Sequence, residues 1–304
     1  MEDYRLIHQG IVGFIRRNRG LMAIWGKEAE RFLNGMITND IRMANDKTTL
    51  KAAFANAQGR LIALARIKRI NDRFLIETDE STHQRLFENL SRFTLAGDFF
   101  IENLTDQYKF FYTCNLSPDS DLGLNFDSNL GTDFFVPNDD CERFIRYLKV
   151  QKSAIEISEQ SFEVLRIEAG MPLHGIDMDE STVVPELGEE GLISYNKGCY
   201  IGQEIIARIR FRGHVAKQLR GLVFLDEPES LEFKTEIKSP DDKNAGYITS
   251  YCFSPHFAAT IALGYVRYEY LAEDILLKVA GKDVKVKDIP FINFTHKRQE
   301  AINE

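Results

Sequence analysis

The 304-residue sequence lacks several features that mark membrane, secreted or disordered proteins. It contains no run of about 18 uninterrupted apolar residues, so a transmembrane helix is not expected. Met1-Glu2-Asp3-Tyr4 carries acids where a targeting peptide carries bases, which favours a cytoplasmic protein. Internal repeats and low-complexity tracts are absent, and 44% of the residues are hydrophobic. This composition predicts two or three domains with substantial cores.

Cysteine is also scarce, and its spacing excludes the common cysteine-based sites. The four cysteines lie at positions 114, 141, 199 and 252, without a Cys-x-x-Cys pair. A zinc site, a redox pair and a disulfide scaffold are therefore not expected. The six histidines show no ligand spacing either, and we expect no stable metal.

The net charge of −8 argues against a protein that coats nucleic acid with its whole surface. The charge is unevenly distributed, because residues 197–220 carry +5 and the remainder carries −13. Residues 110–140 contain six aspartates and no lysine or arginine, and the stretch 116–140 is predicted to form turns between short strands. One segment is thus a positive island in an acidic protein.

Helix and strand patterns alternate along the chain, which indicates an α+β fold. Helices are predicted at 28–36, at 81–95 with Ser81 as N-cap, at 142–150 and at 161–169. A hairpin is predicted at 61–70 and 73–78, and later strands at 219–225, 245–252, 259–266 and 275–279. We therefore expect two parts, residues 1–216 and a C-terminal antiparallel β-barrel domain at 217–304.

The positive island begins with Lys197-Gly198-Cys199-Tyr200-Ile201-Gly202-Gln203-Glu204, followed by Arg208. Its glycines allow a tight turn, and a helix is predicted to begin here, with Glu204 and Arg208 spaced to pair across one turn. A helix N-terminus and a neighbouring lysine both favour a thiolate, so Cys199 has the sequence context of a reactive or metal-ligating residue. A small buried apolar side chain is the alternative for a lone cysteine.

This segment resembles the signature of the YgfZ family, K-G-C-[aromatic]-x-G-Q-E with a basic residue following. Residues 32–40 resemble the family's F-L-x-G-x-x-T-N-D block, and Gln58-Gly59-Arg60 resembles its Q-G-R turn. Residues 166–170 resemble the R-x-E-A-G block shared with GcvT, the aminomethyltransferase of the glycine cleavage system. The resemblance spans residues 32 to about 221. It implies a GcvT-like arrangement of three subdomains around a central folate-binding opening, two of them intertwined within residues 1–216.

The resemblance also implies a cofactor, tetrahydrofolate or a derivative. Glu168 matches a residue that contacts folate in the aminomethyltransferase, and a carboxylate can accept two N–H groups from a pterin edge. The aromatic ring of folate suits an aromatic slot and its glutamyl tail suits cations. We expect the cofactor-binding residues to be Arg166, Glu168, Tyr195, Tyr200 and Arg220. An exposed Glu168 that pairs with Arg166 is the alternative.

One departure separates the two relatives. The aminomethyltransferase carries acids of an L-D-D-L kind in the strand after its glycine turn, whereas Leu61-Ile62-Ala63-Leu64-Ala65 contains none. A carboxylate for acid–base chemistry is missing, so glycine-cleavage chemistry is not expected. The YgfZ relatives share this loss.

Three hypotheses follow. The leading one is a folate-binding accessory protein that supports iron-sulfur cluster assembly or repair, and thereby tRNA methylthiolation, through Cys199. Its partners would be iron-sulfur enzymes or cluster-assembly proteins. A single thiolate cannot hold a cluster alone, so ligation would be shared with a partner. The alternatives are a tetrahydrofolate-dependent one-carbon transferase that lacks the acidic pair, and a tRNA-binding module that uses the positive island.

Overall fold

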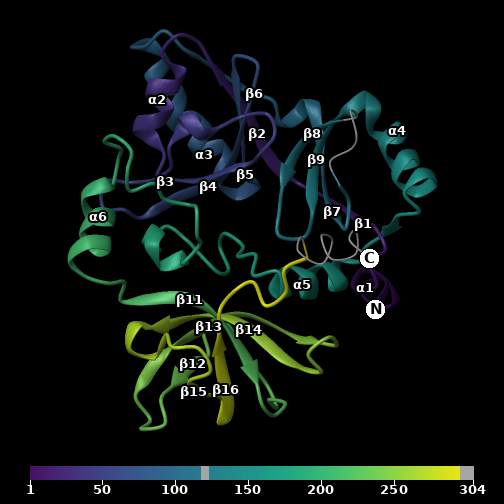
Figure 1. Ribbon diagram of the computed structural model, residues 1–304, viewed down its shortest axis with the longest axis vertical. Helices are drawn as coiled ribbons and strands as arrows, with labels where there is room; N and C mark the ends of the chain where they lie inside the picture. The colour runs from purple at the N-terminus through teal and green to yellow at the C-terminus, as the bar shows by residue number, and fades with distance from the viewer. Residues whose placement is uncertain (118–122, 295–304) are drawn as a thin grey trace.

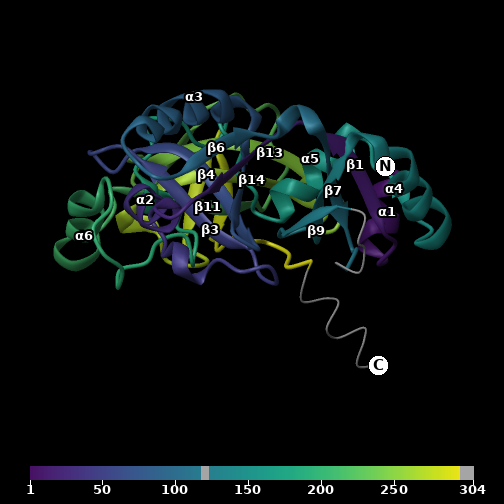
Figure 2. The same ribbon diagram turned by 90° about the horizontal axis from the view of Figure 1, so that it is seen from above.

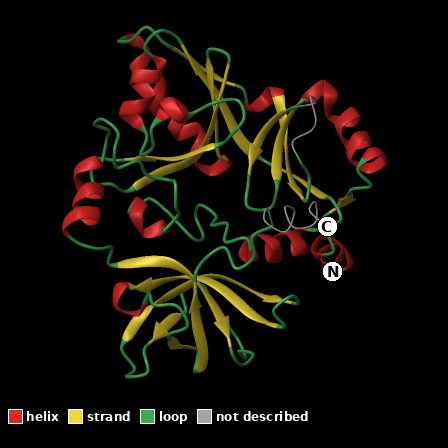
Figure 3. Ribbon diagram, viewed as in Figure 1, coloured by secondary structure: helices red, strands yellow, loops and turns green. Residues whose placement is uncertain are grey.

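The computed structural model describes residues 1–117 and 123–294 of the chain. Two five-stranded sheets and a closed barrel meet around a centre that is crossed by loops (Figure 1). Helices lie at the periphery of the sheets, as Figure 3 shows. The predicted α+β fold with a C-terminal antiparallel barrel is confirmed.

The first sheet has the order β3-β4-β5-β2-β6 and is antiparallel throughout. Its strands are β2 (Arg19–Trp25), β3 (Leu50–Ala55), β4 (Leu61–Ile70), β5 (Arg73–Asp79) and β6 (Phe100–Asn103). The predicted hairpin is confirmed, with Asn71 in the left-handed region (φ 55°) at its turn. Helices α2 (Ala29–Met36) and α3 (Glu80–Ser91) pack on this sheet.

Helix α3 begins differently from the prediction. Asp79, and not Ser81, is its N-cap, because the Asp79 carboxylate accepts the backbone N–H of Ser81 at 3.0 Å. The Ser81 hydroxyl donates to the same carboxylate at 2.7 Å. The charged residue two positions earlier therefore satisfies one of the free amides of the first turn.

The second sheet has the order β10-β1-β7-β9-β8, and β1 pairs in parallel with β10. Its strands are β1 (Gly13–Arg17), β7 (Tyr108–Cys114), β8 (Leu124–Asp127), β9 (Thr132–Pro137) and β10 (Ile155–Glu156). The described part of the stretch 116–140 thus forms short strands and turns as predicted, while residues 118–122, which include Asp119 and Asp121, lie outside the described residues. Helix α4 (Cys141–Arg146) packs beside β9 and continues directly into a π-helical turn at Tyr147–Gln151, so the predicted helix at 142–150 is confirmed, with its second half in the π form.

The two sheets share the N-terminal part of the chain. Strand β1 belongs to the second sheet and β2 to the first, and only Asn18 separates them. The chain returns to the second sheet at β7. Seen from above, the two sheets lie side by side with the β1–β2 connection running between them (Figure 2). This crossing places side chains of β2, β4, β5 and β9 at one seam.

The barrel closes in the order β11-β14-β13-β12-β15-β16. Its strands are β11 (Lys217–Phe224), β12 (Glu236–Lys238), β13 (Asn244–Ser254), β14 (Ala259–Arg267), β15 (Leu276–Val279) and β16 (Lys282–Lys287). Alternate apolar residues such as Leu222, Val284 and Val286 fill its interior. All four predicted strands are confirmed, while β12 and β16 had not been predicted. Residues 295–304 of the predicted barrel domain lie outside the described residues.

Helix α5 (Glu159–Glu168) connects the second sheet to the long central loop, and α6 (Gln203–Arg212) connects that loop to the barrel. The Ser158 hydroxyl caps α5 by accepting the N–H of Ser161 at 3.3 Å. Gly170 follows α5 in the left-handed region (φ 61°), and Ile289 and Pro290 pack where its Cβ would lie. Within the described ranges, no helix is long and apolar enough to cross a membrane.

Candidate functional site

A cavity opens where the two sheets meet the central loop. Its apolar wall includes Leu64, Tyr112, Phe162, Met171 and Leu192. Its charged lining residues are Arg19, Lys51, Arg66, Glu77, Asp127, Arg166 and Glu189. A cavity with aromatic and aliphatic walls and a few fixed polar groups is typical of a small-molecule site.

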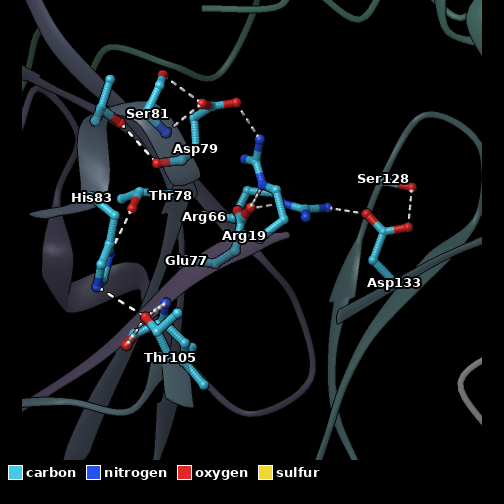
Figure 4. A network of polar contacts seen from close by, with 12 residues as sticks. Arg19, Arg66, Glu77, Thr78, Asp79, Ser81, His83, Thr105, Ser128 and Asp133 are labelled. Atoms are coloured by element: carbon cyan, nitrogen blue, oxygen red, sulfur yellow. Dashed lines mark hydrogen bonds and ion pairs between the residues drawn. The ribbon is translucent and has the colours of Figure 1, made fainter. Parts of the chain in front are cut away.

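Charged side chains form a network across the seam between the sheets (Figure 4). Glu77 on β5 is fully buried and binds two guanidinium groups, those of Arg19 on β2 and Arg66 on β4. The Arg66 Nε lies 2.7 Å from Glu77 Oε2, and its Nη1 lies 2.5 Å from Asp133 Oδ2 on β9. Arg66 therefore joins the two sheets through carboxylates on each of them.

Burial and charge act in opposite directions on these carboxylates. Burial alone would raise the pKa of Glu77, but Arg19 and Arg66 outweigh it and hold that pKa at about 2. Burial raises the pKa of Asp133 to about 6, because Arg66 offsets its desolvation only in part. Glu77 is thus a fixed negative charge, and Asp133 is the carboxylate of the network that titrates near neutral pH.

Arg166 lines the cavity, as expected of a cofactor-binding residue, but its guanidinium is already occupied. It binds Glu163, donates to Asp177 Oδ2 at 3.1 Å, and donates to the Ser250 hydroxyl on β13 at 2.8 Å. Arg166 therefore fixes α5 to the central loop and to the barrel. A direct contact between Arg166 and folate stays a prediction.

Glu168 is not among the described residues that line the cavity. Its Oε1 accepts the hydroxyls of Tyr4 and Ser254, each at 2.5 Å, and its Oε2 lies 2.8 Å from His8 Nε2. Burial and the bond to Glu168 raise the pKa of Tyr4. Glu168 is fully buried and thus holds α1 (Glu2–His8), α5 and the barrel together. The expectation of an exposed Glu168 paired with Arg166 is wrong, and pterin binding by Glu168 stays a prediction.

Lys197 of the motif binds backbone carbonyl oxygens with its side chain. Its ammonium donates to the carbonyl oxygens of Asn34 at 2.6 Å, Ile37 at 2.8 Å and Asn39 at 2.6 Å. These carbonyls lie at and after the C-terminal end of α2, where helix carbonyls lack partners. Burial lowers the pKa of Lys197 to about 8. Two sequence blocks that resemble motifs of the same family are therefore in direct contact.

Gly202 and Tyr200 of the motif are placed by packing, as is Tyr195 just before it. Gly202 caps α6 with φ 88°, and a Cβ at this position would lie 2.6 Å from the Asn56 carbonyl oxygen beside the Q-G-R turn. The Tyr200 ring is buried in a hydrophobic cluster that includes Leu61 and Val184. Tyr195 lies in a separate groove beside α6, where the Arg210 guanidinium stands 5.3 Å from its ring centre. Neither tyrosine is among the described residues that line the central cavity.

Cys199 is exposed and precedes α6. The helix begins at Gln203, so the cysteine lies four residues before it and not in its first turn. Gly198 stands beside Cys199, and a Cβ on this glycine would meet no described atom within 4 Å. The expected pair of Glu204 and Arg208 is confirmed at 2.8 Å. The expectation of a buried cysteine is wrong, and the thiol is accessible.

Arg220 lies on the barrel strand β11 and forms an ion pair with Asp288. Burial lowers its pKa, and its Nε has no hydrogen-bond partner in the described part of the chain. Arg220 is not among the described residues lining the central cavity, so its role toward the glutamyl tail stays a prediction. No group of three or more His, Cys, Asp or Glu side chains in the described ranges is arranged to hold a metal ion.

The network residues Arg19, Arg66, Glu77 and Asp133 had not been identified from the sequence. A signal was present, because Glu77 directly follows the apolar residues 74–76 and Asp133 directly precedes the apolar residues 134–136 within their strands. A charge buried in such a strand requires a partner. The partner could not be named, since Arg19 and Asp133 are far apart in sequence and meet only in the folded chain.

Comparison with known proteins gives two classes of relative. Residues 217–291 match the family "Glycine cleavage T-protein C-terminal barrel domain". The iron-sulfur cluster assembly factor IBA57 homolog, mitochondrial, of Pyricularia oryzae is 28% identical over 249 residues, which are 72% of this chain and 59% of that protein. An aminomethyltransferase of Thermoanaerobacter pseudethanolicus is 22% identical over 320 aligned positions, covering 88% of this chain and 81% of that protein. The chain therefore spans less than two thirds of the length of the Pyricularia oryzae protein.

A solved structure shows the same fold. The crystal structure of glycine cleavage system aminomethyltransferase T from Bartonella henselae superposes with a TM-score of 0.81 at 16% identity. The match covers 95% of this chain and 90% of that chain. The chain thus has the GcvT-like fold with its C-terminal barrel, as the sequence predicted.

Proposed function

We propose that this protein is a folate-binding accessory protein of the YgfZ type, acting in the cytoplasm to support iron-sulfur cluster assembly or repair. The observation that carries the proposal is the composition of one cavity wall. The fold is that of an aminomethyltransferase, yet β4 contributes Leu64 and Ala65 to the cavity, and no carboxylate from residues 61–65. A cavity kept without its acidic pair suits binding rather than transfer.

The cavity residues fit a folate. Tyr112 and Phe162 offer aromatic surface for a flat ring. Lys51 offers an ammonium group, which pairs with Glu189 at 2.6 Å. Bound tetrahydrofolate would supply one-carbon chemistry. The chain's own residues would bind and orient it, because both oxygens of Glu77 are engaged by arginines and this carboxylate holds no mobile proton at neutral pH.

Cys199 supplies the second part of the proposal. Its thiol is exposed, and neither Cys199 nor Glu168 is among the described residues that line the central cavity. One thiolate provides one of the ligands that a cluster needs, so a partner would complete the set. An exposed position beside the open Gly198 allows such an approach. The clients would be iron-sulfur enzymes such as the tRNA methylthiotransferases, and tRNA would enter only through them.

The proposal is tested by two measurements. Calorimetry with tetrahydrofolate should show binding by the wild type, and a deletion strain should recover cluster-enzyme activity from the wild-type gene but not from Cys199→Ser. Cys141→Ser, a change at a half-buried thiol, is the matched control and should restore activity. Full recovery with Cys199→Ser would exclude the thiol role, and absence of folate binding would exclude the cofactor.

A one-carbon transferase is the second candidate, favoured by the wide coverage of the aminomethyltransferase relatives. Asp127 lines the cavity and is the candidate for the missing acid. Its Oδ2 accepts the Thr49 backbone N–H at 3.0 Å. Incubation with methylenetetrahydrofolate and candidate amines should then give turnover that Asp127→Asn abolishes. Binding of folate without turnover argues against this candidate.

A further inference from the structure

One nitrogen of the central network is left without an acceptor. The Arg66 Nε binds Glu77, and its Nη1 binds both Asp133 and the Asp127 carbonyl oxygen, the latter at 3.2 Å. Nη2 of the same guanidinium is buried and has no hydrogen-bond partner among the described residues. A buried donor without an acceptor is uncommon, because leaving it unpaired costs free energy.

The surroundings of Arg66 explain why the protein itself does not satisfy this nitrogen. Arg66 lines the cavity beside Leu64 and Ala65, which carry no side-chain acceptor. The rings of Phe110 and Phe126 stand 5.9 Å and 5.8 Å from its guanidinium carbon and hold it in place. The side chain is 14% exposed, so the guanidinium is a fixed part of the wall. Because the described residues supply no acceptor, a water or a ligand in the cavity would satisfy Nη2.

The charge of the network decides which kind of acceptor fits. Two guanidinium groups, of Arg19 and Arg66, face three carboxylates, of Glu77, Asp79 and Asp133. An additional carboxylate beside Arg66 would add negative charge to a network in which the positive charge is already matched. A neutral carbonyl oxygen satisfies the donor without this penalty.

We propose that Arg66 is a ligand-recognition residue whose Nη2 donates a hydrogen bond to the carbonyl oxygen of a neutral, flat ring bound in the central cavity. This inference rests on the proposed function, in which the ring is the pterin and the oxygen is its 4-oxo group. The glutamyl carboxylates then lie away from Arg66. The site selects a ring with an acceptor at this position over one with a donor.

The test combines two ligands with two proteins. Tetrahydrofolate and its 4-amino counterpart differ at the 4-position, where an amino group replaces the oxygen, and at the adjacent N3, which loses its hydrogen. Calorimetry with the wild type should show the 4-amino compound binding roughly 10-fold to 100-fold more weakly, because it meets the Arg66 donor with another donor. In Arg66→Gln this preference should fall to nearly nothing. Such a cycle separates the contact from general changes in the cavity.

A matched control lies on the same strand. Arg69 is an exposed arginine of β4 that pairs with Glu30 at 3.1 Å, and Arg69→Gln should keep the wild-type preference. Circular dichroism establishes whether each variant folds. If Arg66→Gln does not fold, Arg66→Lys keeps the charge that Glu77 and Asp133 require but lacks the planar fork, and it should lose the preference.

The outcomes separate this inference from the proposed function. If neither compound binds the wild type, the proposed function fails and the inference fails with it. If tetrahydrofolate binds but the wild type does not prefer it, the inference is overturned and the proposed function stands. A preference that is unchanged in folded Arg66→Gln or Arg66→Lys also overturns it.

Discussion

The central network and the Cys199 loop differ in the burial of their reactive groups. Glu77 and Asp133 are fully buried, and each is held by a guanidinium from another strand. Cys199 is exposed, and its neighbour Gly198 packs against nothing within 4 Å among the described atoms. Lys197, only two residues away, is nevertheless buried and anchored. The molecule therefore has two separate features: a charge-paired interior, and an accessible thiol next to the anchored Lys197. Substitutions in one should leave the other unchanged.

The largest effect on stability is expected from Glu77→Gln. This substitution leaves the buried guanidinium groups of Arg19 and Arg66 without their shared countercharge. Breaking a buried ion pair from one side lowers the free energy of unfolding by about 3–5 kcal/mol. Denaturation with urea at pH 7 measures the change. Glu80→Gln, at an exposed glutamate that accepts from Asn18 at 3.1 Å, is the control and should stay within about 0.5 kcal/mol of the wild type. Equal effects of the two substitutions would contradict the buried-network interpretation.

A smaller loss is expected from Lys197→Met, which keeps the apolar stem and removes the ammonium. Three carbonyl oxygens near the end of α2 lose their donor, and the free energy of unfolding should fall by about 2 kcal/mol. Hydrogen exchange at the Ile201 amide, which donates to the Gly35 carbonyl oxygen at 3.1 Å, should accelerate as the base of the loop loosens. Lys27→Met, at a side chain that is 89% exposed, should change neither quantity.

The comparison also shows what the sequence could reveal. Four of the six barrel strands and the hairpin at 61–78 were predictable, because alternating apolar residues and turn residues act over a few positions. The ends of helices were less predictable. Asp79 and Ser81 are both residue types that cap helices, and only the structure shows that Asp79 is the N-cap of α3. The motif around Cys199 was recognisable from its residues. That Cys199 is exposed beside the buried Lys197 could be known only from the structure.

The candidate site was predicted only in part. Arg166 was expected to line the cofactor site and does line the cavity, whereas Glu168 is engaged by Tyr4, His8 and Ser254 instead. Tyr4 and Ser254 are about 250 positions apart, and no local pattern indicates that they share one carboxylate. Long-range pairing between elements therefore determined which charged residues meet.

A pH dependence should distinguish Asp133 from the other carboxylates of the network. Its pKa is about 6 in the folded protein and about 3.9 in an unfolded chain. The protonated form thus favours the folded state: the stability contribution is fully present below pH 4 and is lost as pH rises through about 6. Lowering the pH from 7.5 to 5 should raise the free energy of unfolding of the wild type, relative to Asp133→Asn, by an amount on the order of 1 kcal/mol. Parallel pH profiles of the two proteins would contradict this assignment.

The smallest effect on stability, and the sharpest test of separation, is expected from Cys199→Ser. An exposed side chain contributes little to stability, so the free energy of unfolding should stay within about 0.5 kcal/mol of the wild type. Alkylation with limiting iodoacetamide, followed by mass spectrometry of peptides, should nevertheless find Cys199 modified first. Cys114 is fully buried, and burial, reinforced by Glu168, raises the pKa of Cys252 to about 12. Modification of Cys252 at the same rate would show that the interior opens as readily as the loop. Selective labelling, combined with unchanged stability and a loss of cluster support in cells, would place the function of Cys199 in its contacts with a partner rather than in the fold.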